Sequence, residues 1–324
     1  MRIGMVYDLR DDYLAQGFSE EEAGEFDAPE TIDAIQSALT ALGHEVERVG
    51  ALPALVHALA DGKRWDLVFN IAEGVSGVAR EAQVPALLEA WGIPHTFSSA
   101  DVMVTSMDKA VAKLIVRHHG VNTPDFAVVR TPGDIDLVDF DYPLFVKPLA
   151  EGTSKGVAEI SRVTDAENLE ARCREVLASY RQPALVETYL PGREFTVGLL
   201  GTGDGARVIG VVEITFRPGG DPSAYSWRNK MDAFDRFSLV DDEAARPIAE
   251  TALAAWRALG CRDCGRIDIR LDRLGAPSFI EVNPLAGLRP GWSELTVLAE
   301  LAGMAYQDLI GEIVGHAMAR VEGT

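Results

Sequence analysis

The sequence predicts an α/β protein whose N-terminal part is a doubly wound parallel sheet. Short apolar strands alternate with segments of helical periodicity over residues 2–91, and this alternation is typical of a parallel sheet covered by helices. Hydrophobic residues make up 47% of the 324 positions, which is enough for two or three cores. Because ligands collect at the carboxyl ends of parallel strands, residues 7–10 and 70–74 are the first candidates for a site.

Each element of this first part follows from its own pattern. The helix expected at 28–42 places Ile32, Ile35 and Leu39 on one face and ends before Gly43, which is a C-cap signal. Strands are expected at 2–7, 45–49 and 67–71, and further helices at 52–60 and 84–91. The acidic segment 11–27 is longer than a typical connection, and we expect either a flap or a solvated loop there.

The rest of the chain has a mixed pattern of strands and helices. Strands are expected at 126–130, 144–148, 184–189, 194–200 and 207–214, followed by a hairpin at 265–283. Helices are expected at 101–119, 165–180, 241–259, 293–303 and 306–320. We therefore expect three domains, at 1–98, 99–183 and 184–324.

The acidic composition limits the partners. The net charge of -20 disfavours nucleic acid and anionic membranes, although local basic residues and a metal can still admit an anionic nucleotide. No apolar run approaches the ~20 residues of a membrane span, and the first residues lack the pattern of a signal peptide. The three cysteines fit a reducing compartment. We expect a cytoplasmic protein that binds neither nucleic acid nor membrane.

Cysteine and histidine spacing predicts no metal site. Cys261 and Cys264 have the spacing of half a zinc site, but the sequence contains no second pair. We therefore interpret them as ordinary thiols. The six histidines are scattered without metal-binding spacing.

The most informative segment is the predicted hairpin at 265–283. Both of its halves alternate polar and apolar residues, as half-buried strands do. Folded on itself, the hairpin places Asp268 beside Glu281 and Arg266 near Asn283. Three oxygen ligands and one guanidinium thereby share the polar face of a sheet.

This polar face predicts a divalent cation. Two facing carboxylates repel each other unless a cation lies between them. Oxygen ligands suit Mg²⁺, which usually shares its remaining positions with water and substrate phosphates. The alternative is a solvated face with unrelated charges. The same alternation places Ile280 and Val282 on the opposite, apolar face.

Two other segments favour a nucleotide. After the apolar strand at 144–148, which carries Lys147, the chain runs into a loop of small residues at 149–157. Small residues let backbone N–H groups approach phosphates closely, and the lysine adds a point charge. The spacing is not that of a Walker loop, and a glycine-rich hairpin is the alternative. In the segment 184–197, a turn at 191–192 could pair backbone with a flat base while carboxylates hold ribose hydroxyls.

Taken in order, these segments resemble the ATP-grasp enzymes, and among them the D-alanine–D-alanine ligase group. The resemblance covers most of the chain and is strongest over 144–303, where the stretches 145–157, 187–197, 265–268 and 281–284 follow the family's order. It implies an ATP-grasp fold, ATP as the nucleotide, and two Mg²⁺ ions with Mn²⁺ as an alternative.

The resemblance also implies a role for each matching residue of the nucleotide site. The residues that would contact the phosphates are Lys109 and Lys147, with a covering loop that contains Gly152, Thr153, Ser154 and Gly156. The residues that would line the adenine and ribose sites are Glu187, Tyr189, Leu190 and Glu194.

Metal and catalytic roles are implied in the same way. The metal ligands would be Asp268, Glu281 and Asn283, with Glu281 bridging. Arg266 would stabilise an oxyanion, and Lys230 would reach the γ-phosphate from a lid. Ser293 would help to hold the carboxylate of the acceptor amino acid, and Thr153 keeps the hydroxyl of a loop serine in the family.

The chain departs from the well-known ligases around the substrates. Their ammonium-anchoring glutamate has no clear equivalent, and Glu25 and Asp27 are the two candidates. Glu73 replaces a histidine, and Met231 replaces a tyrosine after the lid lysine. Arg289 has no counterpart; it would face either a substrate carboxylate or solvent.

The leading hypothesis is therefore a ligase that joins two D-alanines through an acyl phosphate. The first alternative is an ATP-grasp ligase for other amino acids or peptides. The second is a nucleotide-binding protein without catalysis, which the complete set of matching residues disfavours. Amino acids are the expected partners, and the family suggests a homodimer.

Overall fold

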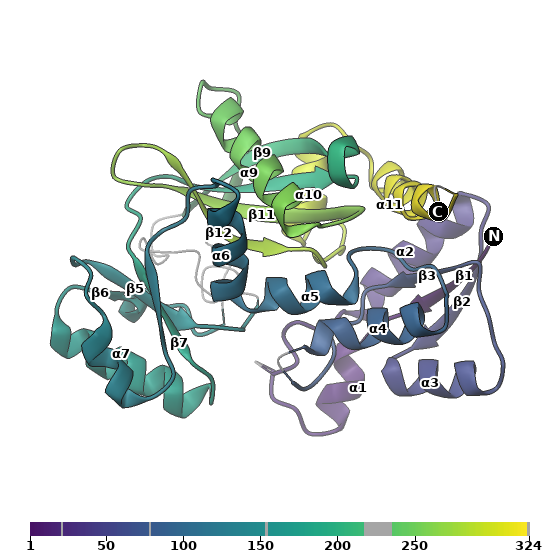
Figure 1. Cartoon of the computed structure of the whole chain (residues 1–324). Coiled ribbons are helices and arrows are strands. Elements are labelled where there is room, and N and C mark those ends of the chain that lie inside the picture. The colour runs from purple at the N-terminus through teal and green to yellow at the C-terminus, as the bar shows by residue number, and fades with distance from the viewer. Residues whose placement is uncertain (21, 78, 153–154, 217–234, 323–324) are drawn as a thin grey trace.

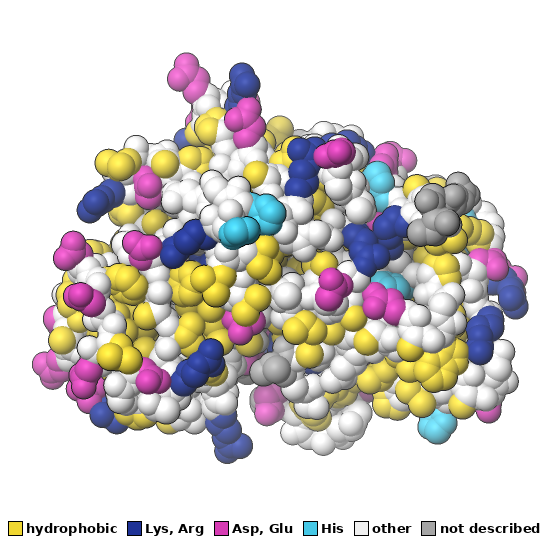
Figure 2. Space-filling model, viewed as in Figure 1, with side chains coloured by type: hydrophobic (Ala, Val, Ile, Leu, Met, Phe, Trp, Pro, Cys, Tyr) yellow, Lys and Arg dark blue, Asp and Glu magenta, His cyan; other side chains and the backbone are white. Residues whose placement is uncertain are grey.

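The computed structural model describes residues 1–20, 22–77, 79–152, 155–216 and 235–322, which form three sheets (Figure 1). One sheet is parallel and lies in the N-terminal part. The other two are antiparallel and lie in the middle and in the C-terminal part of the chain. Acidic side chains are spread over the visible surface and are not gathered in one patch (Figure 2).

The N-terminal sheet has the strand order β2 (Glu45–Gly50), β1 (Arg2–Val6), β3 (Leu67–Asn70). Helices α2 (Pro29–Ala41), α3 (Leu52–Ala60) and α4 (Gln83–Ala90) surround it, and the last helix of the chain, α11 (Tyr306–Glu322), packs beside α2. Ile3 and Met5 of β1 pack in one core with α2 and α11, whereas Val6 packs in another core with α3 and α4. Helices thus cover both faces, and the predicted doubly wound parallel sheet is confirmed.

The acidic segment after β1 is more ordered than its sequence suggests. It contains helix α1 (Arg10–Ala15), and the rings of Phe18 and Phe26 pack on the ring of Tyr13. The Tyr13 hydroxyl donates to the Asp8 carboxylate at 2.5 Å. The alternative of a solvated loop is wrong for this part, because three aromatic rings give the segment a small core of its own. The alternative of a flap stays a prediction.

The middle sheet has the order β4 (Phe126–Val129), β7 (Ala184–Thr188), β5 (Leu144–Pro148), β6 (Arg162–Val163). Helix α7 (Ala166–Ser179) covers one face through Leu169, Cys173 and Val176. Short 3₁₀ turns lie at Arg80–Ala82, Pro132–Leu137, Glu159–Ser161 and Gly203–Gly205.

The third sheet has the order β10 (Asp235–Leu239), β9 (Arg207–Phe216), β8 (Glu194–Leu200), β11 (Cys264–Leu271), β12 (Pro277–Asn283). Helix α9 (Ala245–Leu259) packs on one face through the buried Trp256. Helix α10 (Glu294–Leu301) packs on the other face, where a Cβ at Gly198 would come within 2.6 Å of Leu298. Among the described residues, no helix is long and apolar enough to cross a membrane.

The single helix expected at 101–119 is in fact two helices, α5 (Ala100–Met107) and α6 (Lys109–His118). Asp108 is the break, with φ -82° and ψ 96°. Its carboxylate accepts from the backbone N–H groups of Ala110 and Val111, both at 3.0 Å, and so caps the new helix. The break makes Lys109 the first residue of α6.

We expect Asp108→Ala to lower the free energy of unfolding by about 1 kcal/mol, because the first turn of α6 loses its cap. Chemical denaturation measures the effect. Asp108→Asn keeps an accepting oxygen and should stay close to the parent. Equal stability of the alanine variant and the parent would contradict the capping role.

Candidate active site

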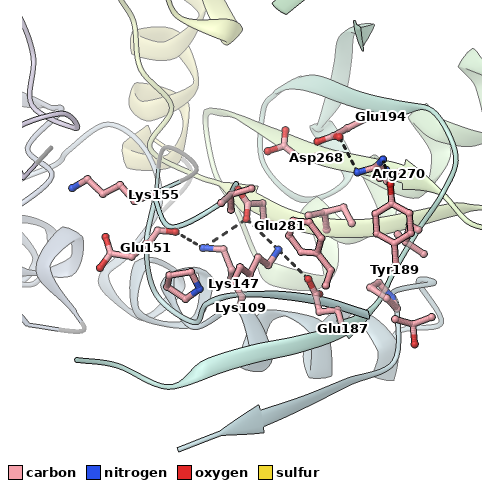
Figure 3. Close-up of a pocket in the computed structure, with 17 residues that line it drawn as sticks. Lys109, Lys147, Glu151, Lys155, Glu187, Tyr189, Glu194, Asp268, Arg270 and Glu281 are labelled. Atoms are coloured by element: carbon pink, nitrogen blue, oxygen red, sulfur yellow. Dashed lines mark hydrogen bonds and ion pairs between the residues drawn. The ribbon is translucent and has the colours of Figure 1, made fainter. Parts of the chain in front are cut away.

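Two cavities adjoin at the centre of the molecule. The first lies between the middle and third sheets, and its wall includes the labelled residues of Figure 3. The second lies between the N-terminal segments and the ends of β11 and β12. Lys109 and Glu151 line both cavities, so the two spaces share a wall.

A chain of alternating charges runs along the first cavity (Figure 3). Glu187 lies between the ammonium groups of Lys113 at 2.7 Å and Lys147 at 3.1 Å. One carboxylate oxygen of Glu281 lies 3.8 Å from the Lys147 ammonium and 3.6 Å from the Lys109 ammonium. Only 2% of Glu187 is exposed, so water contributes little to balancing these charges.

Strand pairing explains the contact between Lys147 and Glu187. In the antiparallel pair β5–β7, Phe145 lies opposite Glu187 and Lys147 lies opposite Leu185. Lys147 and Glu187 are therefore diagonal neighbours on the same face of the sheet, within reach of long side chains.

Burial and neighbouring charges set the protonation of this chain. Burial opposes the charge of Glu187, but Lys113 and Lys147 outweigh it and lower the pKa of this carboxyl. Burial likewise opposes the charge of Lys147, but Glu187 and Glu281 raise its pKa. Burial lowers the pKa of Lys113 to about 8, although Glu187 opposes the shift. The ion pairs of Glu187 and Lys147 therefore persist at neutral pH.

The predicted hairpin register is confirmed. Asp268 lies opposite Glu281, and Arg266 lies opposite Asn283. Arg266 donates to both oxygens of Asp268, and the Asn283 amide lies 3.5 Å from the same carboxylate. Burial raises the pKa of Asp268, although Arg266 opposes the shift.

The oxygen donors on this face suit Mg²⁺, which takes part of its ligands from water and phosphate. They do not suit a metal whose ligands are all protein side chains. Among the described residues, no three His, Cys, Asp or Glu side chains could together hold a metal. Two carboxylates and an amide oxygen are the incomplete set that Mg²⁺ completes with water and phosphate oxygens. Metal binding at Asp268 and Glu281 would thus depend on a phosphate in the first cavity.

A β-bulge corrects one detail of the hairpin. Asp268 pairs with Glu281 but Ile269 pairs with Phe279, which leaves Ile280 as an extra residue on β12. Ile280 lines the first cavity together with Glu281. The prediction that Ile280 shares the apolar face with Val282 is therefore wrong.

Aromatic and charged groups form the far end of the first cavity. Arg270 lies 3.3 Å from the Glu194 carboxylate, donates to the Tyr189 hydroxyl at 3.2 Å, and lies 5.2 Å from the centre of that ring. Burial raises the pKa of Glu194. Leu190 lies on the same wall. A flat, partly apolar ligand with hydroxyl groups fits such a lining.

In the second cavity, Glu25 joins the N-terminal segment to the loop after β5. Its carboxylate accepts from Arg80 at 3.0 Å and from the Gly152 backbone N–H at 3.1 Å, and it lies 3.9 Å from the Lys155 ammonium. A Cβ at Gly152 would come within 2.5 Å of Glu25. Both candidates for a substrate ammonium, Glu25 and Asp27, line the cavity, but Glu25 already has two hydrogen-bond donors and a nearby ammonium group.

Further carboxylates make this wall acidic. Glu73 and Glu81 line the cavity beside Arg80. Burial raises the pKa of Glu73 well above its usual value, and the charge of Glu81 adds to the shift. Burial raises the pKa of Glu81 to about 7, although Arg80 opposes the shift. Burial also raises the pKa of Asp27 to about 7. A cationic ligand group would relieve this crowding.

The wall formed by β11, β12 and the residues after β12 includes Arg266, Asn283 and Arg289, and the carboxylate of Glu294 lines the cavity too. The Ser293 hydroxyl accepts from the Arg289 backbone N–H at 3.0 Å. The Arg289 guanidinium lies 5.4 Å from the centre of the Trp292 ring, which gives it a flat support.

Three predicted residues, Thr153, Ser154 and Lys230, lie outside the described residues, as does Met231. Gly156 has φ 70°, which favours glycine, and a Cβ there would come within 2.6 Å of Pro148.

Residue patterns alone missed several groups of the site. Lys113 lies four residues after Lys109, which is the spacing of one helical face. The two-residue spacing of Arg270 from Asp268 predicts that both lie on the polar face of their strand, but this pattern gave Arg270 no role in the site. Arg80 and Glu151 show no such signal.

The middle and third sheets hold between them a cavity lined by lysines, and two paired carboxylates lie on its edge. This arrangement is that of an ATP-grasp enzyme. Comparison with known proteins supports this class. The family model described as D-ala D-ala ligase C-terminus matches residues 115–315.

The most similar relatives and structures include both characterised and uncharacterised proteins. An uncharacterized protein of Sinorhizobium fredii is 33% identical over 303 residues, covering 90% of this chain and 88% of that protein. The D-alanine–D-alanine ligase of Bordetella petrii is 33% identical over 263 residues, covering 79% of this chain and 77% of that enzyme.

Solved structures share the fold over the whole chain. D-alanine–D-alanine ligase from Bacillus anthracis, complexed with ATP, has a TM-score of 0.74 at 23% identity and covers 100% of both chains. VanG D-Ala:D-Ser ligase from Enterococcus faecalis has a TM-score of 0.74 at 19% identity and covers 98% of this chain and 99% of its own.

The chain belongs to the D-alanine–D-alanine ligase family. It is accordingly an ATP-dependent ligase that forms a peptide bond.

We expect Arg80→Met to lower the free energy of unfolding by about 3 kcal/mol, because it leaves the buried Glu25 carboxylate without its guanidinium partner. Chemical denaturation measures the loss. The double variant Arg80→Met/Glu25→Gln removes both charges and should recover more than about half of it. If the double variant is less stable than Arg80→Met, the pairing of these two side chains is not what stabilises the contact.

Proposed function

We propose that the protein joins two D-alanine molecules, with ATP hydrolysed to ADP and phosphate, and so makes the cell-wall dipeptide. One observation carries the proposal. The polar face of the β11–β12 hairpin serves both cavities, with Asp268 and Glu281 in the first and Arg266 and Asn283 in the second. A phosphoryl group bound in the first cavity would therefore meet an amino acid bound in the second.

The nucleotide is proposed to occupy the first cavity. Lys109 and Lys147 would contact its phosphates, and the loop with Gly152, Thr153, Ser154 and Gly156 would cover them. Glu187, Tyr189 and Leu190 would line the adenine site, and Glu194 would hold the ribose. The support is that six of the described members line the first cavity, that Gly152 lines the second, and that Gly156 lies in the chain between Lys155 and Val157, which line the first.

Asp268, Glu281 and Asn283 would together hold two Mg²⁺ ions, with Mn²⁺ as an alternative. The incomplete donor set and the repulsion between the two carboxylates support this assignment. When bound, the metal neutralises charge on the phosphate oxygens.

The chemistry of the chain's own residues follows from their placement. The carboxylate of the first amino acid attacks the γ-phosphorus, and ADP leaves; the product is an acyl phosphate. The amine of the second amino acid attacks the acyl carbon, and phosphate leaves. Arg266 would stabilise the oxyanion that forms at this carbon, and Lys230 would reach the γ-phosphate. Exclusion of water would protect the acyl phosphate.

The two walls of the second cavity would orient the amino acids. Ammonium groups would face the acidic wall with Asp27, Glu73 and Glu81. The carboxylate of the acceptor would face Ser293 and Arg289.

A second candidate function is a ligase of the same mechanism for other amino acids or peptides. Arg289 and Glu73 favour it, because both line the substrate cavity at positions where the well-known ligases differ.

We expect D-alanine to stimulate phosphate release from ATP with Mg²⁺, and mass spectrometry to detect the dipeptide. A panel of other D- and L-amino acids is the control. ATP binding without any response to D-alanine, and a response to another member of the panel, would favour the second candidate.

We expect Asn283→Ala to lower kcat by about 100-fold or more, because one metal ligand is lost while ATP can still enter. Asn283→Asp keeps an oxygen donor and should retain measurable turnover. Steady-state kinetics at several Mg²⁺ concentrations provide the measurement. Normal kcat in the alanine variant would refute the metal assignment.

A further inference from the structure

Lys113 is a fully buried ammonium that the proposed chemistry does not use. Its exposed fraction is 0%. The ammonium lies 2.7 Å from Glu187, donates to the Thr123 hydroxyl at 3.1 Å and to the Phe279 carbonyl at 3.3 Å. These contacts join α6 to the middle and third sheets.

Lys113 has no direct access to a ligand. It is absent from the described residues that line the two cavities, whereas Lys147 and Glu187 both line the first. Lys113 binds Oε1 of Glu187, and Lys147 binds Oε2 of the same carboxylate. Lys113 therefore acts on Lys147 mainly through the carboxylate that they share, whereas its contacts with Thr123 and the Phe279 carbonyl carry no charge.

We propose that Lys113 is a positioning residue for nucleotide binding, which neutralises Glu187 so that Lys147 presents a net positive charge to the phosphates. This inference rests on the proposed nucleotide site in the first cavity.

The balance of charge explains the need for Lys113. Glu187 and Glu281 offset two of the three ammonium charges of Lys109, Lys113 and Lys147, which leaves one positive charge for the ligand. Without Lys113, the remaining pair of Glu187 and Lys147 has no net charge. The Glu187 carboxylate then interacts with the Lys147 ammonium alone. A phosphate then gains little from Lys147, because in a buried site the repulsion from Glu187 is poorly screened.

The contact with Thr123 allows a purely structural role to be tested separately. Thr123 is buried, and its hydroxyl also donates to the Phe279 carbonyl at 2.9 Å. Thr123→Val removes this hydrogen bond and one of the two neutral acceptors of Lys113. It leaves the charges unchanged.

Lys113→Met tests the proposal by its dependence on phosphate. Isothermal titration compares ATP with adenosine, both with Mg²⁺ and without an amino acid. We expect the Kd for ATP to rise about tenfold or more, and the Kd for adenosine to change less than about twofold. An equal loss for ATP and adenosine, or unchanged ATP binding, would overturn the proposal.

Glu187→Gln removes the carboxylate that Lys113 neutralises, and it is the reference for the double variant Lys113→Met/Glu187→Gln. We expect loss of Lys113 to change the Kd for ATP less than about threefold in this background, and Thr123→Val to bind ATP like the parent. If Lys113→Met does not fold, the comparison of Glu187→Gln with the double variant decides: a further loss of about tenfold in the double variant would overturn the proposal.

The same titration separates this inference from the proposed function. ATP binding by the parent tests the nucleotide site, and the D-alanine response of phosphate release tests the reaction. The ratio between the variants tests Lys113, and this ratio does not depend on which amino acid the enzyme uses.

Discussion

Burial of the Glu187 carboxylate is the constraint on which the site depends. A buried carboxylate needs cations, and this one takes them from α6 and from β5. By recruiting Lys113 and Lys147, it fixes the helix against the middle sheet, and Lys113 extends the connection to β12 through the Phe279 carbonyl. Because a buried ion pair costs more to break than an exposed one, the geometry of the first cavity is tied to the packing of two sheets.

The β11–β12 hairpin contributes residues to both cavities and so connects them. Its strand period of two puts Arg266, Asp268 and Arg270 on one face, so that Arg266 lines the second cavity while Asp268 and Arg270 line the first. The hydrogen bond from the Gly152 backbone N–H to the Glu25 carboxylate joins the N-terminal segment to the same site. Few elements are thereby needed to bring an amino acid and a nucleotide together.

Local patterns predicted much of this arrangement, and long-range contacts account for the rest. Hairpin register followed from alternation, and most strands and helices lie close to where periodicity placed them. The bulge at Ile280 depends on the fit of neighbouring strands, which alternation does not record. The pair of Arg80 and Glu25 joins residues 55 positions apart, which a local pattern cannot record. Asp108 is a residue type that begins helices, but this signal was weaker than the continuous apolar pattern around it.

The packing of α11 on α2 joins the two ends of the chain. Residues from both ends share one core with the N-terminal sheet, and Arg320 donates to the His95 carbonyl at 2.8 Å. Leu200 and Cys264 of the third sheet belong to the same core, as do Leu295 and Ala299 of α10. The N-terminal sheet and the third sheet therefore cannot separate without exposing shared apolar surface to water, so the first and last residues of the chain help to hold the wall of the second cavity in place.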